Sequence, residues 1–370
     1  MTISLCVIAY NEEKTLKRLF ECISAQNFDK KNTELVFVDS DSSDNTKKLF
    51  LDFAEKNRED YLDISVLDNP RRIQSAGWNT AISAASGDVI IRLDAHASVP
   101  PDFLSKNAEL ISEGEYVCGG ARPNNIDEPT PWKETLLAAE GSMFGSSIAS
   151  YRRSGGGKQY VDSLFHAAYR REVFAKAGGF DVSLGRTEDN ELHYRIRQNG
   201  FRICQSDEII SYQNVRPTLR LMLSQKYGNG KWIGLTVGKC PGCLSLFHFV
   251  PFCFVIAVIV CMIMYAVSVF TGLWLLSIPL YALNAAYFAA DMLMTVAAII
   301  TADRRNATMI LLPFIFPLLH IVYGWGTVVG FLCLPSWKKS LDGSAEKEIE
   351  QVRLAVKEGG NREKKMSYQV

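Results

Sequence analysis

Over the first 215 residues, short apolar runs alternate with polar segments that carry apolar side chains at helical spacing. Runs at 4–10, 34–38, 64–67 and 89–94 have the length and the β-branched content of strands. The helical patterns between them are Leu16 to Ile23, the segment through Leu49 and Phe53, and Gln74 to Ala85. This alternation predicts an α/β fold with a mostly parallel sheet covered by helices on both faces.

The pattern changes after residue 243. Between 244 and 334 the charged side chains are only Asp291, Asp303, Arg304 and Arg305. Three apolar runs in this region are each longer than the ~20 residues that cross a ~30 Å hydrocarbon layer. They are 244–270, 272–302 and 307–334. Buried core helices are the alternative, but three such runs in succession favour about three transmembrane helices, with a fourth or a re-entrant segment left open.

These changes divide the chain into four ranges. Residues 1–215 have the length of one sizeable soluble domain, 216–243 form a basic amphipathic segment, 244–334 are the transmembrane region and 335–370 are a charged tail. The basic segment carries five cations and no acidic residue, which favours the anionic face of a membrane. The cations are Arg216, Arg220, Lys226, Lys231 and Lys239.

The start of the chain and its cysteines indicate the compartment. No basic region followed by an apolar stretch opens the sequence, so we expect no signal peptide and a soluble domain that stays in the cytosol. The nine cysteines are scattered, and disulfides are not expected in a reducing cytosol. The prediction is a multi-pass protein of the cytoplasmic membrane. Three spans would export the tail, whereas a kink or re-entrant hairpin at Pro313 and Pro317 would keep it inside.

The strand at 89–94 ends in two candidate metal ligands, Asp94 and His96. Residues two apart in an extended chain point the same way, so these side chains can converge on one ion. A carboxylate and an imidazole suit Mn²⁺ or Mg²⁺, and an ion at a strand end is well placed for a diphosphate. A carboxylate that orients the histidine, or ordinary loop polarity, is the alternative.

Polar groups follow two further strands. Tyr10, Asn11 and Glu12 end the first, and Asp39 and Asp41 end the second. In parallel sheets the binding crevice lies outside the carboxyl ends of the strands, where all of these groups would meet. Solvated turn acids are the alternative for each residue singly.

Two arginines and one aspartate have candidate roles in this crevice. Asp39 is suited to accept from a base N–H or a ribose hydroxyl. Arg71 and Arg72, in the loop after Pro70, carry forked donors that suit a base or phosphate. The alternative is that Arg71 and Arg72 are ordinary surface arginines.

Taken in order, these motifs resemble the GT-A glycosyltransferases of family 2. The match runs from Val7 to Glu13, from Val38 to Asp44 and through Asp94-Ala95-His96. It continues at Gly178-Gly179-Phe180-Asp181, Thr187-Glu188-Asp189 and Arg195-Ile196-Arg197, and covers roughly residues 3–215. The Asp-Ala-His form, followed by membrane segments, is most similar to succinoglycan-type exopolysaccharide glucosyltransferases.

The resemblance implies a GT-A fold, Rossmann-like, and a UDP-sugar donor. By similarity Asp39 contacts the uracil with Arg71 or Arg72 nearby, and Asp41 lines the same pocket. Asp94 and His96 hold Mn²⁺ or Mg²⁺ on the diphosphate, where a dication offsets the charge that develops on the departing UDP. Family 2 inverts the anomeric centre, so a base is required for the acceptor hydroxyl.

Asp189 is the candidate base, with Glu188 beside it. Thr187 is placed to cap the helix that continues through Leu192 and Ile196, which would hold both acids at a helix start facing the crevice. The alternative is that the two acids merely complement the helix dipole.

Two departures from the family pattern limit the finer assignment. Many processive members carry Gln-x-x-Arg-Trp before the membrane, but here the region from Gln225 to Trp232 does not keep that motif. The sequence therefore favours transfer of one sugar per encounter. His96 also replaces the usual second aspartate, and imidazole tolerates Mn²⁺ more readily than Mg²⁺.

The expected function is transfer of a hexose, glucose by resemblance, from UDP to a polyprenyl-diphosphate-linked saccharide for exopolysaccharide. Membrane lipid is a further expected partner, and nucleic acid is not. Residues 131–169 mix aromatic and basic side chains, which suit either a lipid-linked acceptor or ordinary packing; the side chains in question are Trp132, Leu136, Met143, Phe144, Tyr151, Arg152 and Arg153. The rivals are a polyprenyl-phosphate glycosyltransferase and a non-catalytic nucleotide-sugar sensor or scaffold.

Overall fold

The computed structural model describes residues 1–145 and 157–359, which divide into two compact units. Of these residues, the first unit holds 1–123, 157–213 and 341–359, and the second holds 124–145 and 214–340. Both units are therefore assembled from segments that are separate in the sequence.

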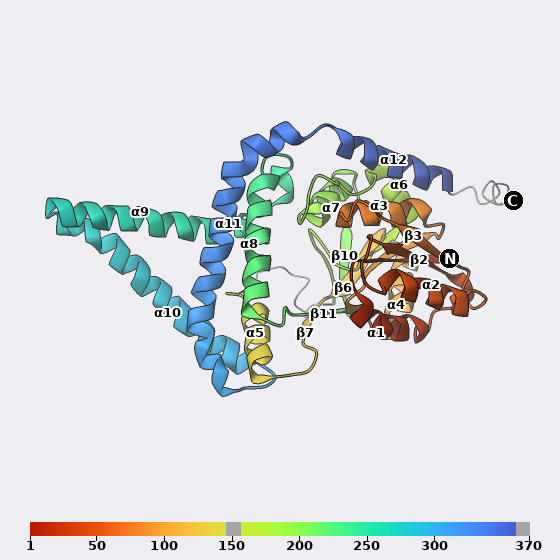
Figure 1. The fold of residues 1–370 in the computed structure, drawn as a ribbon, viewed down its shortest axis with the longest axis horizontal. Helices are drawn as coiled ribbons and strands as arrows, with labels where there is room; N and C mark the ends of the chain where they lie inside the picture. Colours follow the sequence, from red (N-terminus) through yellow and green to blue (C-terminus); the bar gives the residue numbers. More distant parts are fainter. Residues whose placement is uncertain (146–156, 360–370) are drawn as a thin grey trace. The chain divides into compact units, whose positions relative to one another are not determined.

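An eight-stranded, mostly parallel sheet forms the first unit (Figure 1), in the spatial order β3-β2-β1-β4-β9-β6-β10-β8. The strands are β1 (Ile3–Ala9), β2 (Thr33–Asp39), β3 (Asp63–Asp68), β4 (Val89–Asp94), β6 (Val117–Ala121), β8 (Lys158–Tyr160), β9 (Ala168–Arg170) and β10 (Ile203–Ile210). β9 runs antiparallel to both β4 and β6, and β8 runs antiparallel to β10. Two short strands, β5 (Ala97–Ser98) and β11 (Tyr212–Asn214), pair separately through Ser98 and Tyr212.

Helices cover both faces of this sheet, which confirms the predicted α/β architecture. One core packs α1 (Glu13–Ser24), α2 (Thr46–Asn57) and α4 (Phe103–Ser112) against the sheet. The opposite core contains α3 (Gln74–Ala84), α6 (Arg171–Ala177), α7 (Glu188–Gln198) and α12 (Ser344–Gly359). Because successive strand residues point to opposite faces, Leu5 and Val7 lie in the first core and Cys6 lies in the second.

The C-terminal helix α12 departs from the charged tail expected for 335–370. Val352 and Val356 are buried in the same core as Phe174, and the Ile349 carbonyl accepts from the Gly179 N–H at 3.2 Å. The apolar side chains of α12 are few, but they recur at helical spacing and so form one buried stripe. Residues 344–359 therefore belong to the first unit, although about 130 residues of the second unit precede them.

The second unit is helical. Its main helices are α5 (Pro131–Gly141), α8 (Leu219–Thr236), α9 (Val250–Thr271), α10 (Ile278–Thr301) and α11 (Leu312–Ser340). Three segments are long and apolar enough to cross a membrane: Leu246–Thr271, Trp274–Thr301 and Ala307–Ser340. The apolar helices predicted after residue 243 are therefore present. The segment 216–243, predicted as basic and amphipathic, contains the helix α8.

Part of the predicted acceptor region lies in the second unit. Leu136 is buried with Leu312 in one apolar cluster, and Phe144 packs edge-on against Phe316. These side chains serve packing within this unit. The other candidates, Tyr151, Arg152 and Arg153, lie outside the described residues.

Candidate active site

The carboxyl ends of β1, β2 and β4 meet at one edge of the sheet. In the parallel register Ala9 lies opposite Asp39, and Ile8 lies opposite Asp94. The polar groups after β1 therefore share this edge with Asp39 and Asp94. This is the arrangement that strand-helix alternation predicted.

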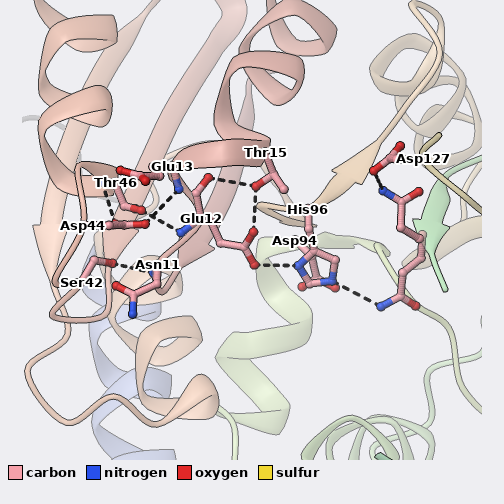
Figure 2. A network of polar contacts seen from close by, with 12 residues as sticks. Asn11, Glu12, Glu13, Thr15, Ser42, Asp44, Thr46, Asp94, His96 and Asp127 are labelled. Carbon is pink, nitrogen blue, oxygen red and sulfur yellow. Dashed lines mark hydrogen bonds and ion pairs between the residues drawn. The ribbon is translucent and has the colours of Figure 1, made fainter. Parts of the chain in front are cut away.

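Two loops at this edge are tied to each other by hydrogen bonds, and Figure 2 shows this network from close by. The bonds run from Asn11 N–H to Ser42 Oγ (3.0 Å), from Ser43 N–H to Asn11 Oδ1 (2.8 Å), from Glu12 N–H to Thr46 Oγ1 (2.8 Å) and from Glu13 N–H to Asp44 Oδ2 (3.2 Å). Asn11 and Asp41 have φ of 55° and 58°, a left-handed conformation that Asn and Asp tolerate better than other side chains. The loops are thereby held in a defined shape around the edge.

Asp39 is buried at the end of β2. Its Oδ2 accepts from the Ser42 N–H at 3.1 Å. Its Oδ1 is also buried and has no hydrogen-bond partner among the described residues. A buried acceptor left unpaired costs about 1–3 kcal/mol, so this oxygen is suited to a donor that a ligand brings.

The two predicted arginines already have carboxylate partners. Arg72 Nη2 lies 2.7 Å from Asp41 Oδ2, and its guanidinium lies 5.6 Å from the centre of the exposed Tyr10 ring. Arg71 Nη1 lies 2.5 Å from Glu348 Oε2 on α12. The C-terminal helix thus reaches the loop that was expected to contact the nucleotide.

Asp94 is buried at the end of β4, and His166 supports it. His166 Nε2 lies 3.2 Å from Asp94 Oδ2, and its Nδ1 lies 2.8 Å from Ser211 Oγ. Burial opposes ionisation of Asp94, but the hydrogen bond from His166 and the positive charge of Arg92 favour it. Together they hold the pKa of Asp94 below its usual range. Asp94 is therefore ionised at neutral pH.

His96 lies between two side chains that define its tautomer (Figure 2). Its Nδ1 lies 3.1 Å from Glu12 Oε1, and its Nε2 lies 3.3 Å from Gln213 Nε2. Arg122 donates to Gln213 Oε1, which leaves the Gln213 amide nitrogen to face the imidazole. Since a carboxylate oxygen accepts and the amide nitrogen can only donate, the proton lies on Nδ1. The Nε2 lone pair then accepts from the Gln213 amide, and a cation bound to Nε2 would take the place of that amide.

The donor set at this edge fits a divalent cation shared with a diphosphate. Within residues 1–145 and 157–359, no group of three His, Cys, Asp or Glu side chains is arranged to hold a metal ion. Mg²⁺ commonly takes only one or two protein carboxylates and completes its shell with water and substrate phosphate. A histidine that binds through one nitrogen while a carboxylate orients the other is a common metal ligand. Asp94 and His96 match that arrangement, with Glu12 as the orienting group.

Asp189 lies in the first turn of α7 and is joined to β4 by a buried ion pair. Arg92 Nη1 donates to Asp189 Oδ1 at 2.6 Å, and both residues are buried. The guanidinium lies between two rings, 4.5 Å from the centre of Trp78 and 4.6 Å from that of Phe180. Since Arg92 precedes Asp94 by two residues on one strand, the candidate base and the candidate metal ligand share a support.

Glu188 is held in its protonated form by its surroundings. Burial, and then the charge of Asp189, raise the pKa of Glu188 to about 8. Its Oε2 is buried without a hydrogen-bond partner among the described residues. Glu188 is therefore largely neutral at pH 7, whereas Asp189 has a cation beside it.

The helix that carries these acids is anchored on its buried side. Arg195 pairs with Glu191 through Nε at 2.8 Å and Nη2 at 2.6 Å, and it also donates to the Gly179 carbonyl at 2.8 Å. His193 bridges Ser163 Oγ and Tyr169 Oη, each at 2.8 Å. Thr187 occupies the predicted N-cap position, but its side chain makes no capping hydrogen bond.

Four residues of the site were not predicted from the sequence: Arg92, Arg122, His166 and Gln213. Arg92 had a visible signal, because it is the one charge within the apolar run from Val89 to Leu93. His166 and Gln213 reach the site from segments more than 70 residues away from their partners. No local pattern marks them.

Comparisons with known proteins show which family the chain is similar to. Residues 4–178 match the family model described as glycosyl transferase family 2. The succinoglycan biosynthesis protein ExoA of Rhizobium meliloti (strain 1021) is 29% identical over 235 residues, which are 62% of this chain and 68% of that protein. The dolichyl N-acetyl-alpha-D-glucosaminyl phosphate 3-beta-D-2,3-diacetamido-2,3-dideoxy-beta-D-glucuronosyltransferase of Methanococcus voltae is 24% identical over 336 residues, 89% of this chain and 97% of that protein.

A solved structure shares the fold. The mannosyltransferase from Pyrobaculum calidifontis, solved in complex with GDP-Man and Mn²⁺, superposes with a TM-score of 0.56. It is 17% identical in sequence, and the match covers 89% of this chain and 86% of that one. At this identity the likeness shows the fold alone, which is the GT-A-like architecture expected from the sequence.

Proposed function

We propose that this chain, whose residues 4–178 match the family model described as glycosyl transferase family 2, transfers a hexose from a UDP-sugar to a hydroxyl of a polyprenyl-diphosphate-linked saccharide. One observation carries the proposal: Asp39 and Asp94 lie at one edge of the sheet, Asp189 is joined to the strand that ends in Asp94, and each of the three is held by a different partner. Asp39 keeps a buried oxygen for the nucleotide, Asp94 is held ionised by His166, and Asp189 is fixed by Arg92.

The mechanism follows from these three supports. Asp94 and His96 would hold a divalent cation, which supplies charge stabilisation to the departing diphosphate. Asp39 and the loops around Asn11 bind and orient the nucleotide. Asp189 accepts the proton of the acceptor hydroxyl as that oxygen attacks the anomeric carbon from the side opposite the UDP. Arg92 orients the Asp189 carboxylate through its hydrogen bond and keeps it in place during the transfer.

The acceptor class is inferred from the membrane helices and the relatives. Three helices long and apolar enough to cross a bilayer follow the catalytic segment, which suits a substrate with a lipid carrier. The Methanococcus voltae relative is named for transfer to a dolichyl-phosphate-linked sugar, and the Rhizobium meliloti relative is named for succinoglycan biosynthesis. The cytosolic face of the cytoplasmic membrane is the proposed location.

Mass spectrometry of lipid-linked saccharides tests this function. Membranes that contain the full chain are incubated with labelled UDP-sugars and a lipid-linked saccharide extract, and membranes with the Asp94→Ala variant serve as control. We expect one hexose added to a lipid-linked saccharide through a bond that resists mild acid. A labelled sugar released by mild acid as a monosaccharide would identify a polyprenyl-phosphate acceptor instead. UDP release unaffected by Asp94→Ala together with Asp189→Asn would indicate a sensor or scaffold.

Replacing His96 with Asp is expected to change the metal preference. The variant substitutes a carboxylate for an imidazole, and carboxylates suit Mg²⁺ better than imidazole does. We expect the ratio of Mg²⁺-supported to Mn²⁺-supported turnover to rise by roughly tenfold, within the 10- to 100-fold range typical of changes around a metal site. The ratio is measured on one preparation, so it is independent of the amount of folded protein. An unchanged ratio would remove His96 from the metal site.

A further inference from the structure

The segment 214–340 of the second unit is connected to the first unit by a short link at each of its ends. β11 ends at Asn214 and α8 begins at Leu219, while α11 ends at Ser340 and α12 begins at Ser344. Since α12 is part of the core of the first unit, the chain before 214 and the chain after 340 belong to one folded body. A folded domain lies on one side of a bilayer. The chain between these points must therefore cross the membrane an even number of times, although it contains three candidate spans.

Packing within the second unit identifies α11 as the helix that does not cross. α11 runs beside α8 in the same direction (Figure 1), with Gly230 against Tyr323 and Gly234 against Thr327 and Gly330. These glycines leave no room for a Cβ, so the two backbones are in close contact. α8 carries Arg220, Lys226 and Lys231, of which Lys226 pairs with Glu140 on α5 at 2.8 Å. A cation without such a partner costs about 2.5–3.5 kcal/mol at the centre of a bilayer. A crossing by α11 would take this basic helix with it.

The start of α11 also lies within reach of the first unit. Met222 on α8 shares a buried cluster with Leu312 and Ile315 at the start of α11. From Asn214 to Met222 the chain spans at most about 22 Å, with its last turn helical, which is less than the ~30 Å hydrocarbon thickness. The start of α11 is therefore on the same side of the bilayer as its end.

A second contact supports this placement. Asn306, just before α11, accepts from Thr135 Oγ1 at 3.4 Å and donates to Glu134 Oε2 at 3.0 Å. Thr308 Oγ1 donates to the Pro131 carbonyl at 2.9 Å. α5 begins only eight residues after Pro123, the last residue of that segment of the first unit. The connection between α10 and α11 is thus packed on α5, a helix that begins eight residues along the chain from the first unit.

The remaining face of α11 is apolar and exposed. Its side chains are three, four or seven residues apart, which places them in one stripe along the helix. They are Phe314, Leu318, Ile321, Trp325 and Leu332. One face of α11 is thus covered by α5 and α8, and the other is an apolar stripe that a membrane interface can accept.

The helices α9 and α10 form a hairpin with a different character (Figure 1). Most of their surface is exposed and apolar, and their 22 and 24 residues correspond to about 33 and 36 Å of helix. The turn at Gly272 and Leu273 contains no charged residue. Between 214 and 340 the chain has nine Lys and Arg against two Asp, and none of the nine lies within the hairpin. This distribution matches an anionic surface on the side from which the hairpin enters.

We propose that the α9–α10 hairpin is the part of the described chain that crosses the bilayer, twice, and that α11 lies in the interface on the side of the first unit. The partner of the α11 stripe is a lipid bilayer with anionic headgroups. This topology is independent of the transferase activity, since it follows from helix packing and from the place of α12.

Labelling of single cysteines tests the topology in the full chain. The nine native cysteines are replaced, and one cysteine is introduced by Lys56→Cys, Leu273→Cys, Asp303→Cys or Lys357→Cys, all at exposed positions. Sealed vesicles of either orientation are treated with an impermeant maleimide. We expect positions 56, 303 and 357 to react from one side and position 273 from the other. Reaction of 357 from the side opposite to 56 would establish three crossings and overturn the proposal, as would reaction of 273 from neither side.

Two further measurements keep the test decisive if the cysteine-free chain does not fold. An epitope inserted after Asp303 of the otherwise native chain should be digested by protease from the same side as the first unit. A fluorophore at Leu332→Cys should be quenched more strongly by nitroxides near the headgroups than by nitroxides at mid-chain, with Ile263→Cys on α9 as the matched control that shows the reverse. Mid-chain quenching at both positions would place α11 across the bilayer.

Discussion

Replacing Asp189 with Asn is expected to lower turnover by about 10²–10⁴-fold while UDP-sugar binding is retained. The amide has nearly the shape of the carboxylate and can still accept from Arg92 through its oxygen, but it cannot take the proton of an acceptor hydroxyl. The measurement is turnover at saturating donor in native membranes, alongside donor affinity by equilibrium binding. Near-normal turnover would remove Asp189 from the mechanism.

Glu188→Gln is the matched control for this experiment. Burial and the neighbouring Asp189 charge raise the pKa of Glu188 to about 8, so glutamine resembles the neutral acid that is present at pH 7. We expect this variant to lose less than about tenfold in turnover, since general-base contributions begin at ~10². If Glu188→Gln lost more activity than Asp189→Asn, the base would be Glu188.

The Glu188→Gln variant should also differ from the wild type in how its stability depends on pH. The pKa of Glu188 is raised from an unfolded value of 4.5, so the folded state favours the protonated form. Between about pH 4.5 and about pH 8 the folded state keeps a proton on Glu188 that the unfolded state has already lost. This residue therefore makes the wild-type protein less stable as the pH rises through that range. Thermal unfolding of Glu188→Gln should show a weaker pH dependence over that window.

The sheet and the ends of its strands could be predicted from the sequence, because each strand is marked by a pattern within a few neighbouring residues. Each buried strand is a short apolar run, and the residue after it lies at the edge of the sheet whatever the rest of the chain does. Asp39 and Asp94 were placed correctly at that edge for this reason. The partners of Asp94 and His96 were not predicted, since His166 and Gln213 reach the site through tertiary contacts that leave no periodic pattern.

The C-terminal half was harder to predict for a related reason. Hydropathy counts the apolar side chains of a helix but does not show what covers them. α11 has the composition of a membrane span, yet one of its faces packs on α8 and α5 within the second unit. Residues 344–359 have the composition of a solvated tail, yet Val352 and Val356 complete the core of the first unit. In both helices the covering partner is distant in sequence.

Replacing Arg92 with Met is expected to destabilise the first unit by about 3–5 kcal/mol. The substitution keeps a side chain of similar length between Trp78 and Phe180 but leaves Asp189 buried without its cation, and removing one partner of a buried ion pair costs this amount. For a domain of this size the melting temperature should fall by roughly 6–20 °C. The measurement is thermal unfolding of the full chain in detergent. A decrease of less than about 2 °C would show that Asp189 does not depend on Arg92.

Combining Arg92→Met with Asp189→Asn separates loss of the ion pair from loss of packing. Arg92→Met is expected to lower the free energy of unfolding because the Asp189 charge is left buried and unpaired. Removing the charge then restores part of the lost stability, and the double variant is more stable than Arg92→Met alone. Residues in direct contact commonly show such coupling, of about 0.5–3 kcal/mol. Additive losses in the double variant would mean instead that Arg92 acts through its contacts with the two aromatic rings. In that case its role in aiming the base would have to be abandoned, since Asp189 would keep its position without the guanidinium.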